Sequence, residues 1–504
     1  MTFDKPIMLG ARASVLARVQ AREVGAALQA RHPGLDIRYS FLSSPADREL
    51  DTPLPELLKR GGFTGDLGVA LRAGSIDVAV HLWKDLPFSS HPQTQIVATL
   101  PRADARDLLL VKREWLTGRD RSELRVLSSS ARRRTNLSGF LQWALPTKPP
   151  RVTFVLARGD CEARLEQLMG GDAAALVLAK ANIDRLLAST DAEFSAVRER
   201  VLAVLDACEV MVLPLALNPT APGQGALAIE IRRDRPELAE LLAPINDAAT
   251  FGRVLAERAR LAPTGDEDHP FGVSIIPVHC GEIEFTRGQQ AGQWIQNAEL
   301  RRNDSPLPHA ANGHAVWTGE SGSMERYRRV ALPVRHDHFA DARIALFVAR
   351  SEAWPDGYTP RPRQVVWSAG IDTWRRLASR GIWVHGSDES LGESGGRGVA
   401  RLFPRVQRWV KFSHESGYDS PFSERIPTYR LERSGPLDDL SGRTHFYWRS
   451  GAQFYDYLRA NPEIRGAWHG CGPGNTFSMI RAAIGEERVR AFLTAEVFRQ
   501  EVEQ

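Results

Sequence analysis

Ser75-Ile-Asp-Val-Ala-Val-His-Leu-Trp-Lys-Asp-Leu-Pro87 is the stretch that decides the fold. Residues 76–80 are short, mostly apolar and β-branched, which predicts a buried strand. Lys84 and Asp85 follow at the exit of this strand, and Pro87 prevents further strand pairing. In α/β sheets, the ends of strands are where catalytic and binding groups gather. Taken alone, Lys84 and Asp85 would more simply be a surface ion pair beside a turn.

The composition is that of a soluble globular protein of several domains. The chain has 504 residues, which suggests about three or four domains. Its apolar share is 43%, its charged share is 25% and its net charge is +4, so composition alone does not indicate a nucleic-acid partner. Arginine is frequent near predicted loops, which favours small polyanionic substrates. We therefore expect a small-molecule substrate.

Other features argue against export, membrane insertion and metal binding. The four cysteines are scattered and form no CxxC pair, which is typical of a cytoplasmic protein. We see no secretory signal at the N-terminus. The longest apolar stretch, residues 201–217, is interrupted by Asp206 and Glu209 and cannot span a bilayer. The 13 histidines show no ligand spacing, so no metal site is expected. The oligomeric state cannot be predicted.

Read in order, strands and helices alternate along the chain, which predicts α/β domains. The segment 101–107 crosses into a second domain, and residues 213–230 return to the first. Two such crossings between α/β domains make a cleft with hinges, where ligands favour binding. The predicted strands in this part of the chain are 6–10, 35–41, 76–80, 108–111, 152–156, 173–179 and 226–231.

Six segments, in order, resemble the porphobilinogen deaminase (hydroxymethylbilane synthase) family. The first is the stretch quoted above, which is similar to the V-H-S-x-K-D-x-P of that family. Six similar motifs in the right order rarely arise by chance. Together they cover about residues 7–285. The other five are Gly10-Ala-Arg-Ala-Ser-Val-Leu-Ala17, residues 57–71, Ser128-Ser-Ser-Ala-Arg-Arg133, Ala157-Arg-Gly-Asp-Cys-Glu-Ala-Arg-Leu165 and Pro222-Gly-Gln-Gly-Ala226.

The resemblance implies an activity and a set of site residues. Four porphobilinogen units would be condensed head to tail with loss of ammonia, each step passing through a cationic azafulvene. Asp85 would stabilise that cation and carry the proton, with Lys84 beside it. The implied substrate-binding residues are Arg12, Ser14, Arg60, Ser129, Ser130, Arg132, Arg133, Arg158, Arg164, Arg185 and Gln224.

The resemblance also implies the domain organisation. Two lobes like those of periplasmic binding proteins would be followed by a small α+β third domain and a C-terminal α/β region. Ser450 and Thr476, at Gly- or Ser-containing turns before predicted helices, resemble carboxylate-binding positions of uroporphyrinogen III synthase. The expected boundaries are 1–104 with 205–230, 105–204, 231–305 and 306–504, with a linker at Asn303 to Gly322.

The chain departs from the family pattern at two loops. In residues 57–67, Arg60 stands at the position of one family lysine and Gly65 replaces another. In residues 265–272, Glu267 occupies the position of the cysteine whose thioether holds the dipyrromethane cofactor. A carboxylate cannot form that bond. Cys280, on a predicted strand over 274–280, is a poor substitute, because a strand cysteine is usually inert core.

These departures leave two functions open. The chain could be a synthase in tetrapyrrole biosynthesis, fused to a ring-closing C-terminal half. Alternatively, it could be a non-catalytic relative that binds a linear tetrapyrrole or another polycarboxylate. The dipyrromethane cofactor is expected for the family, and the sequence predicts that it is not attached covalently here.

Overall fold

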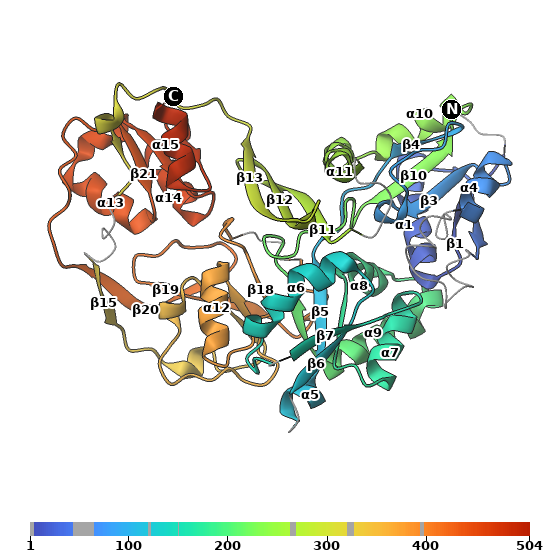
Figure 1. The fold of residues 1–504 in the computed structure, drawn as a ribbon, viewed down its shortest axis with the longest axis horizontal. Helices are drawn as coiled ribbons and strands as arrows, with labels where there is room; N and C mark the ends of the chain where they lie inside the picture. The colour runs from blue at the N-terminus through green and yellow to red at the C-terminus, as the bar shows by residue number, and fades with distance from the viewer. Residues whose placement is uncertain are drawn as a thin grey trace. The chain divides into compact units, whose positions relative to one another are not determined.

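The computed structural model describes residues 5–43, 65–118, 122–149, 151–262, 269–319, 327–393 and 398–503. Contacts divide the chain into two compact units, the first built mainly from residues 1–275 and the second mainly from residues 298–504. Both units are α/β, as the sequence predicts, with helices beside mixed or parallel sheets (Figure 1). Within the described part, no helix has the length and apolar character needed to cross a membrane.

The first lobe of the first unit is a five-stranded sheet in the order β2-β1-β3-β10-β4. β1 runs parallel to β2 and β3, whereas β10 runs antiparallel between β3 and β4. Leu9, Val78 and Ile229 from three of these strands are fully buried in one core. The elements are β1 (Ile7–Arg12), β2 (Ile37–Leu42), β3 (Val78–Leu82), β4 (Thr94–Ala98), β10 (Leu227–Arg232), α1 (Val15–Arg31), α4 (Gly65–Arg72), α10 (Pro236–Leu242) and α11 (Ala248–Leu261).

The second lobe of the same unit is another five-stranded sheet, in the order β7-β6-β8-β5-β9. β9 pairs with β5 inside this second sheet, which contradicts the expected domain boundary at residue 205 but agrees with the expected return to the first lobe at residue 213. The elements are β5 (Asp107–Lys112), β6 (Glu123–Leu127), β7 (Arg151–Val155), β8 (Ala175–Ala179), β9 (Cys208–Val212), α5 (Arg113–Thr117), α6 (Ala131–Ala144), α7 (Cys161–Gly170), α8 (Lys180–Ala188) and α9 (Ser195–Ala207).

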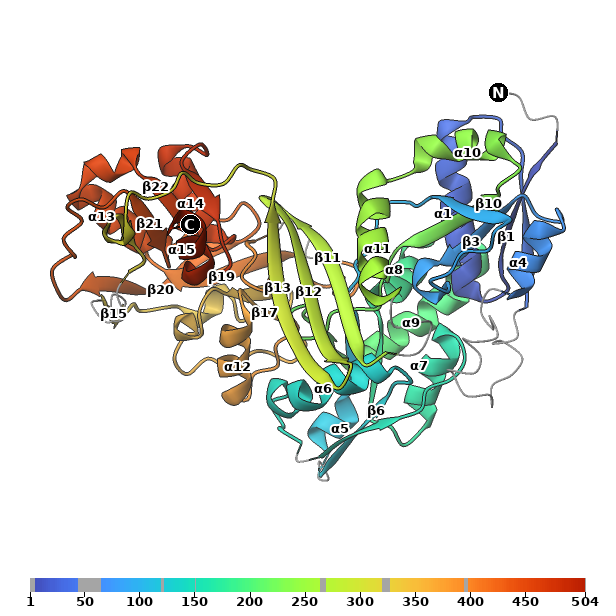
Figure 2. The ribbon, with the colours of Figure 1, turned by 45° about the horizontal axis from the view of Figure 1, so that its top comes forward.

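A three-stranded sheet follows, with β11 (Phe271–Val278), β12 (Gly281–Gln290) and β13 (Gln293–Arg302) side by side (Figure 2). Cys280 lies in the turn between β11 and β12, not on a strand as the sequence predicts. The reason is that β11 ends at Val278 and the chain reverses before Gly281, which begins β12 with φ at +148°. Cys280 packs into an apolar cluster of the second unit that includes Phe446 and Trp448.

The second unit contains a six-stranded sheet in the order β15-β20-β19-β16-β17-β18. All neighbouring pairs are parallel except β15 with β20. The mostly apolar residues 382–385 predict a strand here, but only Gly386 and Ser387 pair with β17. The elements are β15 (Tyr327–Ala331), β16 (Ile344–Val348), β17 (Val366–Ser368), β18 (Gly386–Ser387), β19 (Arg408–His414), β20 (Glu424–Arg433) and α12 (Ile371–Ser379).

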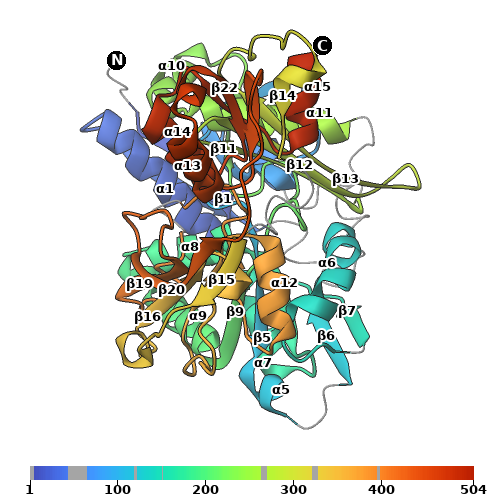
Figure 3. The ribbon, with the colours of Figure 1, turned by 90° about the vertical axis from the view of Figure 1, so that its left-hand side faces the viewer.

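A smaller, fully parallel sheet in the order β14-β21-β22-β23 completes the second unit, and the chain ends with α15 (Figure 3). The segment 303–322, expected to be a linker, contains β14, which pairs with β21. The elements are β14 (Val316–Trp317), β21 (His445–Trp448), β22 (Trp468–Cys471), β23 (Val489–Ala491), α13 (Gly451–Ala460), α14 (Asn475–Ile484) and α15 (Ala495–Glu503). Short 3₁₀ turns are Ala192–Phe194, Ala243–Ile245, Gly313–Ala315, His336–His338, Ser351–Ala353 and Pro462–Gly466.

Candidate active site

Lys84 and Asp85 lie in a single 3₁₀ turn, η1 (Trp83–Asp85), directly after β3. Trp83 holds this turn in place, because its ring is fully buried and packs edge-on against Phe251, with ring centroids 5.0 Å apart. The backbone N–H of Trp83 also donates to the carbonyl of Ala226, at 3.2 Å. The two predicted catalytic side chains therefore sit on a turn anchored by the core, and both are half-buried.

The amine of Lys84 is more acidic than that of an ordinary lysine. Burial lowers the pKa of Lys84 to about 8, since an ammonium group loses hydration inside the protein. The charge of Asp85 raises that pKa, whereas the charges of Arg133 and Arg132 lower it. The Lys84 ammonium donates to the Oε1 atom of Gln224, at 3.2 Å. A group with these properties can accept or release a proton during a reaction.

A fully buried carboxylate, Asp107 at the start of β5, gathers four side chains around it. Arg132 Nη2 donates to it at 3.0 Å, and Arg133 donates through Nε at 3.1 Å and Nη2 at 2.6 Å. Asn218 and Gln224 each add an amide N–H at 2.9 Å. Burial by itself raises the pKa of Asp107, but Arg133 and Arg132 hold it far below its usual range. The site is thus built around one permanent negative charge.

The family resemblance implies that Arg132 and Arg133 bind substrate carboxylates. In the structure, most of the N–H groups of these two guanidinium groups already donate to other protein atoms. Besides Asp107, Arg132 donates to Asn218 and to the carbonyl of Pro219, and Arg133 donates to the carbonyl of Val177. Both guanidinium groups are buried, with exposed fractions of 4% and 6%. Their bonds fix the helix start at α6 against β5 and β8. Their contact with substrate stays a prediction.

The three serines at the end of β6 have different surroundings. Ser129 donates its hydroxyl to the carbonyl of Ala157. The Ser130 hydroxyl accepts a long bond, 3.5 Å, from the N–H of Arg133 at the start of α6. Ser128 is 2% exposed, and its hydroxyl has no hydrogen-bond partner in the described part of the chain. An unpaired buried hydroxyl is costly, so Ser128 is a site at which a ligand oxygen would be stabilising.

Arg158 and Arg164 lie before and within the first turns of α7. The backbone of Arg158 is held by the amide of Gln167, while its side-chain Nε is buried without a hydrogen-bond partner among the described residues. Arg164 Nε donates to the carbonyl of Gly159, at 3.0 Å. Burial, and next the charge of Arg133, lowers the pKa of Arg164, whereas Asp85 raises it. Arg164 therefore belongs to the same electrostatic site as Asp85.

Ser14 takes the N-cap position of α1, but its side chain makes no capping bond. Its hydroxyl is therefore available at a helix N-terminus, where backbone N–H groups attract anions. Arg12 ends β1 two residues earlier and is half-buried. The pair could hold one carboxylate, which is the role that the family resemblance implies.

Arg185 joins the two lobes. Its Nε donates to Glu23 on α1 at 2.9 Å, and its Nη2 donates to the carbonyl of Gly225 at 3.0 Å. Only 6% of Arg185 is exposed, and its Nη1 atom is buried without a partner among the described residues. The Nε and Nη2 groups of Arg185 thus connect the two lobes. Carboxylate binding by Arg185 remains a prediction that rests on Nη1 alone.

The remaining predicted positions lie outside the described residues or belong to the second unit. Arg60 and Glu267 lie outside the described residues. In the second unit, Ser450 caps α13 by accepting from the N–H of Gln453 at 3.2 Å, and Thr476 is the second residue of α14. β21 and β22 are parallel neighbours with Trp448 opposite Cys471, so the turns that follow them lie at the same edge of the sheet.

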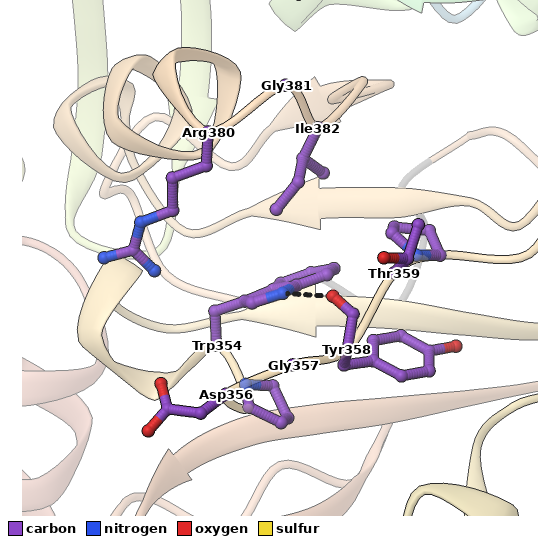
Figure 4. Close-up of a pocket in the computed structure, with 10 residues that line it drawn as sticks. Trp354, Asp356, Gly357, Tyr358, Thr359, Arg380, Gly381 and Ile382 are labelled. Carbon is purple, nitrogen blue, oxygen red and sulfur yellow. Dashed lines mark hydrogen bonds between the residues drawn. The ribbon is translucent and has the colours of Figure 1, made fainter.

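A hollow of about 380 Å³ in the second unit contains none of the predicted residues. Trp354, Tyr358, Arg380 and Ile382 line it, and the Trp354 indole N–H donates to the carbonyl of Tyr358 at 3.1 Å (Figure 4). Arg380 is already bound to the carbonyl of Ser351. The hollow therefore gives no independent indication of chemistry.

Sequence reasoning missed Asp107 and Cys161. Asp107 ends the Pro101 to Asp107 crossover, and the signal that could have found it is an acid that begins an otherwise apolar strand. Cys161 was read only as part of a motif, yet the charges of Arg164 and Lys84 both act on it. Burial raises the pKa of the Cys161 thiol to about 12, so it stays protonated.

Comparison with known proteins decides the family. Residues 7–240 match the family described as porphobilinogen deaminase, dipyromethane cofactor binding domain. A porphobilinogen deaminase from Roseiflexus sp. (strain RS-1) is 37% identical over 263 residues, which cover 52% of this chain and 78% of the relative. This chain belongs to the porphobilinogen deaminase family. Another porphobilinogen deaminase, from Syntrophobacter fumaroxidans, is 33% identical over 316 residues, which cover 60% of this chain and 93% of the relative.

Solved structures give a weaker likeness. A probable amino-acid ABC transporter extracellular-binding protein from Bacillus subtilis aligns over 50% of this chain and 95% of its own, with 14% identity and a TM-score of 0.26. That score is too low to support a statement about the fold.

The described residues fit the carboxylate arms of a dipyrromethane but not a thioether at Cys280. Arg158 has an unpaired buried Nε, and the Ser14 hydroxyl is not used for capping, so each can bind a carboxylate oxygen. When bound, the group supplies the primer on which the product chain grows. Cys280 instead packs among aromatic side chains, and burial raises the pKa of its thiol to about 11.

We predict that the purified chain has the intact mass of its unmodified sequence. The physical reason is that Glu267 cannot form a thioether and that the thiols of Cys280 and Cys161 stay protonated. Mass spectrometry of the wild type, Cys280→Ser and Cys161→Ser measures this directly. An adduct that disappears in one of the two variants would contradict the prediction and identify that cysteine as the anchor.

Proposed function

We propose that this chain acts in tetrapyrrole biosynthesis as a hydroxymethylbilane synthase, joining four porphobilinogen units with loss of ammonia. Family membership supports the substrate class. The observation that carries the proposal is that Lys84 and Asp85 share one electrostatic site with Arg133 and Arg164, although these residues come from two lobes. A carboxylate, an amine of lowered pKa and cations for carboxylate arms are the groups that this reaction needs.

The chemistry can be assigned to atoms of these residues. The carbon–nitrogen bond of a porphobilinogen aminomethyl group, protonated as an ammonium, breaks; neutral ammonia leaves with the bonding electrons and the positive charge passes to the pyrrole. The Asp85 carboxylate stabilises that charge, because a fixed anion in a half-buried site is more effective than water. The free α-carbon of the neighbouring pyrrole then attacks the methylene carbon, and its proton passes to Asp85 or to the fraction of Lys84 that is neutral.

The acetate and propionate arms of the substrate need donors at a distance from the reacting carbon. Arg158 lies just before α7 and Arg164 in its first turn, while Arg12 ends β1 and Ser14 takes the N-cap position of α1. Guanidinium groups and helix N-termini both bind carboxylates well. These residues would therefore orient the arms while Asp85 acts on the bond that breaks.

For the C-terminal half we propose ring closure to uroporphyrinogen III. The support is its resemblance to that synthase at Ser450 and Thr476, together with the parallel register of β21 and β22 that brings both turns to one sheet edge. The Ser450 hydroxyl accepts a backbone N–H as an N-cap, and the α14 N-terminus adds further N–H groups. Substrate carboxylates would bind along this edge.

A second candidate function is a non-catalytic binder of linear tetrapyrroles or other polycarboxylates. Two observations favour it: Glu267 stands at the expected anchor, and the forks of Arg132 and Arg133 are largely committed to Asp107. A single assay distinguishes the two functions. The binder would retain added hydroxymethylbilane, whereas the synthase would consume porphobilinogen.

We predict that the full chain converts porphobilinogen mainly to the type III isomer of uroporphyrinogen. Spontaneous closure of released hydroxymethylbilane gives only the type I isomer, so chromatographic separation of the two products reports on the C-terminal half alone. A double variant, Ser450→Ala with Thr476→Val, is expected to give type I product at an unchanged rate of porphobilinogen consumption. Type I product from the wild type would show that this half does not close the ring.

A further inference from the structure

We propose that Gln224 is a positioning residue: its amide, oriented by Asp107, holds the Lys84 ammonium group beside Asp85. The inference rests on the proposed function for its catalytic meaning, since it concerns the group that works with Asp85. It changes the role that the family resemblance gives Gln224, from substrate contact to action through Lys84.

The hydrogen bonds of Gln224 fix which way its amide faces. The side chain is 1% exposed, and its Nε2 atom donates to the carbonyl of Ala105 at 2.6 Å and to Asp107 Oδ1 at 2.9 Å. Both of these partners are acceptors only, so a reversed amide would place its oxygen against two other oxygens. The Oε1 atom must therefore point the other way, where Lys84 Nζ donates to it at 3.2 Å.

The backbone holds Gln224 just as firmly. Its flanking residues Gly223 and Gly225 have φ of +75° and +88°, a region that favours glycine. A Cβ atom on Gly225 would lie 2.4 Å from the carbonyl oxygen of Ala103, so this turn is pressed against the first crossing between the lobes. Arg102 Nε also donates to the Gln224 carbonyl, at 2.8 Å. The position of Gln224 is therefore set by its contacts with the crossing segment, and Gln224 in turn sets the position of the Lys84 ammonium group.

A neutral acceptor suits this position. The charged and titratable groups that act on Lys84 or lie near it are Asp85, Asp107, Arg132, Arg133 and Cys161. The amide oxygen stabilises the ammonium form by its dipole and adds no net charge. Lys84 therefore keeps a partner in its charged form while remaining able to lose its proton near neutral pH.

The test compares Gln224→Met with the wild type. Methionine has a similar volume but offers no strong acceptor, so the ratio of neutral to charged Lys84 at a fixed pH should rise about tenfold. The probe is acetic anhydride, and mass spectrometry measures the pH dependence of acetylation at Lys84. This readout needs no turnover, so it separates failure of the inference from failure of the proposed function.

Two further variants make the result decisive. Gln224→Glu keeps an oxygen facing Lys84 but sets its second oxygen against Asp107 and the Ala105 carbonyl, so the comparison uses protein that folds by circular dichroism. In that protein the Lys84 titration should stay at or above the wild-type midpoint. Gln93→Glu is the matched control, because Gln93 is exposed in the first lobe and should change nothing. If Gln224→Met does not fold by circular dichroism, Gln224→Asn replaces it, since the shorter amide cannot reach both Asp107 and Lys84. A Lys84 midpoint in the folded variant equal to that of the wild type would overturn the proposal.

Discussion

Asp85→Asn is expected to lower the turnover of porphobilinogen by about a hundredfold to ten-thousandfold while leaving substrate binding nearly unchanged. Asparagine has the same shape but no charge, so it cannot stabilise the cation that forms when ammonia leaves. The anchored turn that carries Asp85 should not move, because Trp83 beside it is fully buried and holds the backbone. The loss should therefore appear in kcat and not in KM.

Steady-state rates of porphobilinogen consumption measure this effect. Asp172→Asn is the control, since that carboxylate is 91% exposed and belongs to the same unit. Because Asp85→Asn should disable only the first reaction, the same variant given hydroxymethylbilane is expected to form type III product. Turnover near the wild-type rate would remove Asp85 from the mechanism.

Asp107→Ala is expected to lower the free energy of unfolding by about 3–5 kcal/mol. The substitution leaves the buried guanidinium groups of Arg132 and Arg133 without their shared counter-charge, and such groups are costly inside a protein. Asp234→Ala, which removes an exposed partner of Arg232, is the control and should cost under about 1 kcal/mol. Urea unfolding near neutral pH gives both values.

The same pair of proteins should show a characteristic pH dependence. The folded-state pKa of Asp107 is depressed, so its contribution is present above its unfolded value of about 4 and is lost as pH falls toward the folded value. The stability difference between the wild type and Asp107→Ala should therefore shrink below about pH 4. A stability difference that is constant from pH 7 to pH 3 would contradict the conclusion that the charge of Asp107 stabilises the folded protein.

Local structure could be predicted well because its signals are local. The spacing of Val19, Val24 and Leu28 predicts a helix from residue 15 to about residue 30, and α1 covers Val15–Arg31. The turn that holds Lys84 and Asp85 follows from an apolar strand and a proline. The missed features depend on residues far apart in sequence. Nothing near Asp107 reveals that Gln224 will lie 2.9 Å away.

Strand pairing shows the same limit in the second unit. The sequence between Asn303 and Gly322 is rich in polar residues, Gly and Pro, so it reads as a linker. Val316 and Trp317 nevertheless form β14, because the exposed edge of β21 accepts them and Trp317 fits an aromatic core. An edge strand of two residues carries almost no periodic signal, and only its partner makes it a strand.

The placement of β10 in the first sheet has a consequence for synthesis on the ribosome. β4 pairs only with β10 among the described strands, and β10 is translated after all five strands of the second lobe. The second lobe can therefore complete its sheet while the first still lacks a central strand. N-terminal domains usually fold first during translation. In this chain we expect the reverse order, with the first lobe open at β3 and β4 until the emerging chain returns to close it.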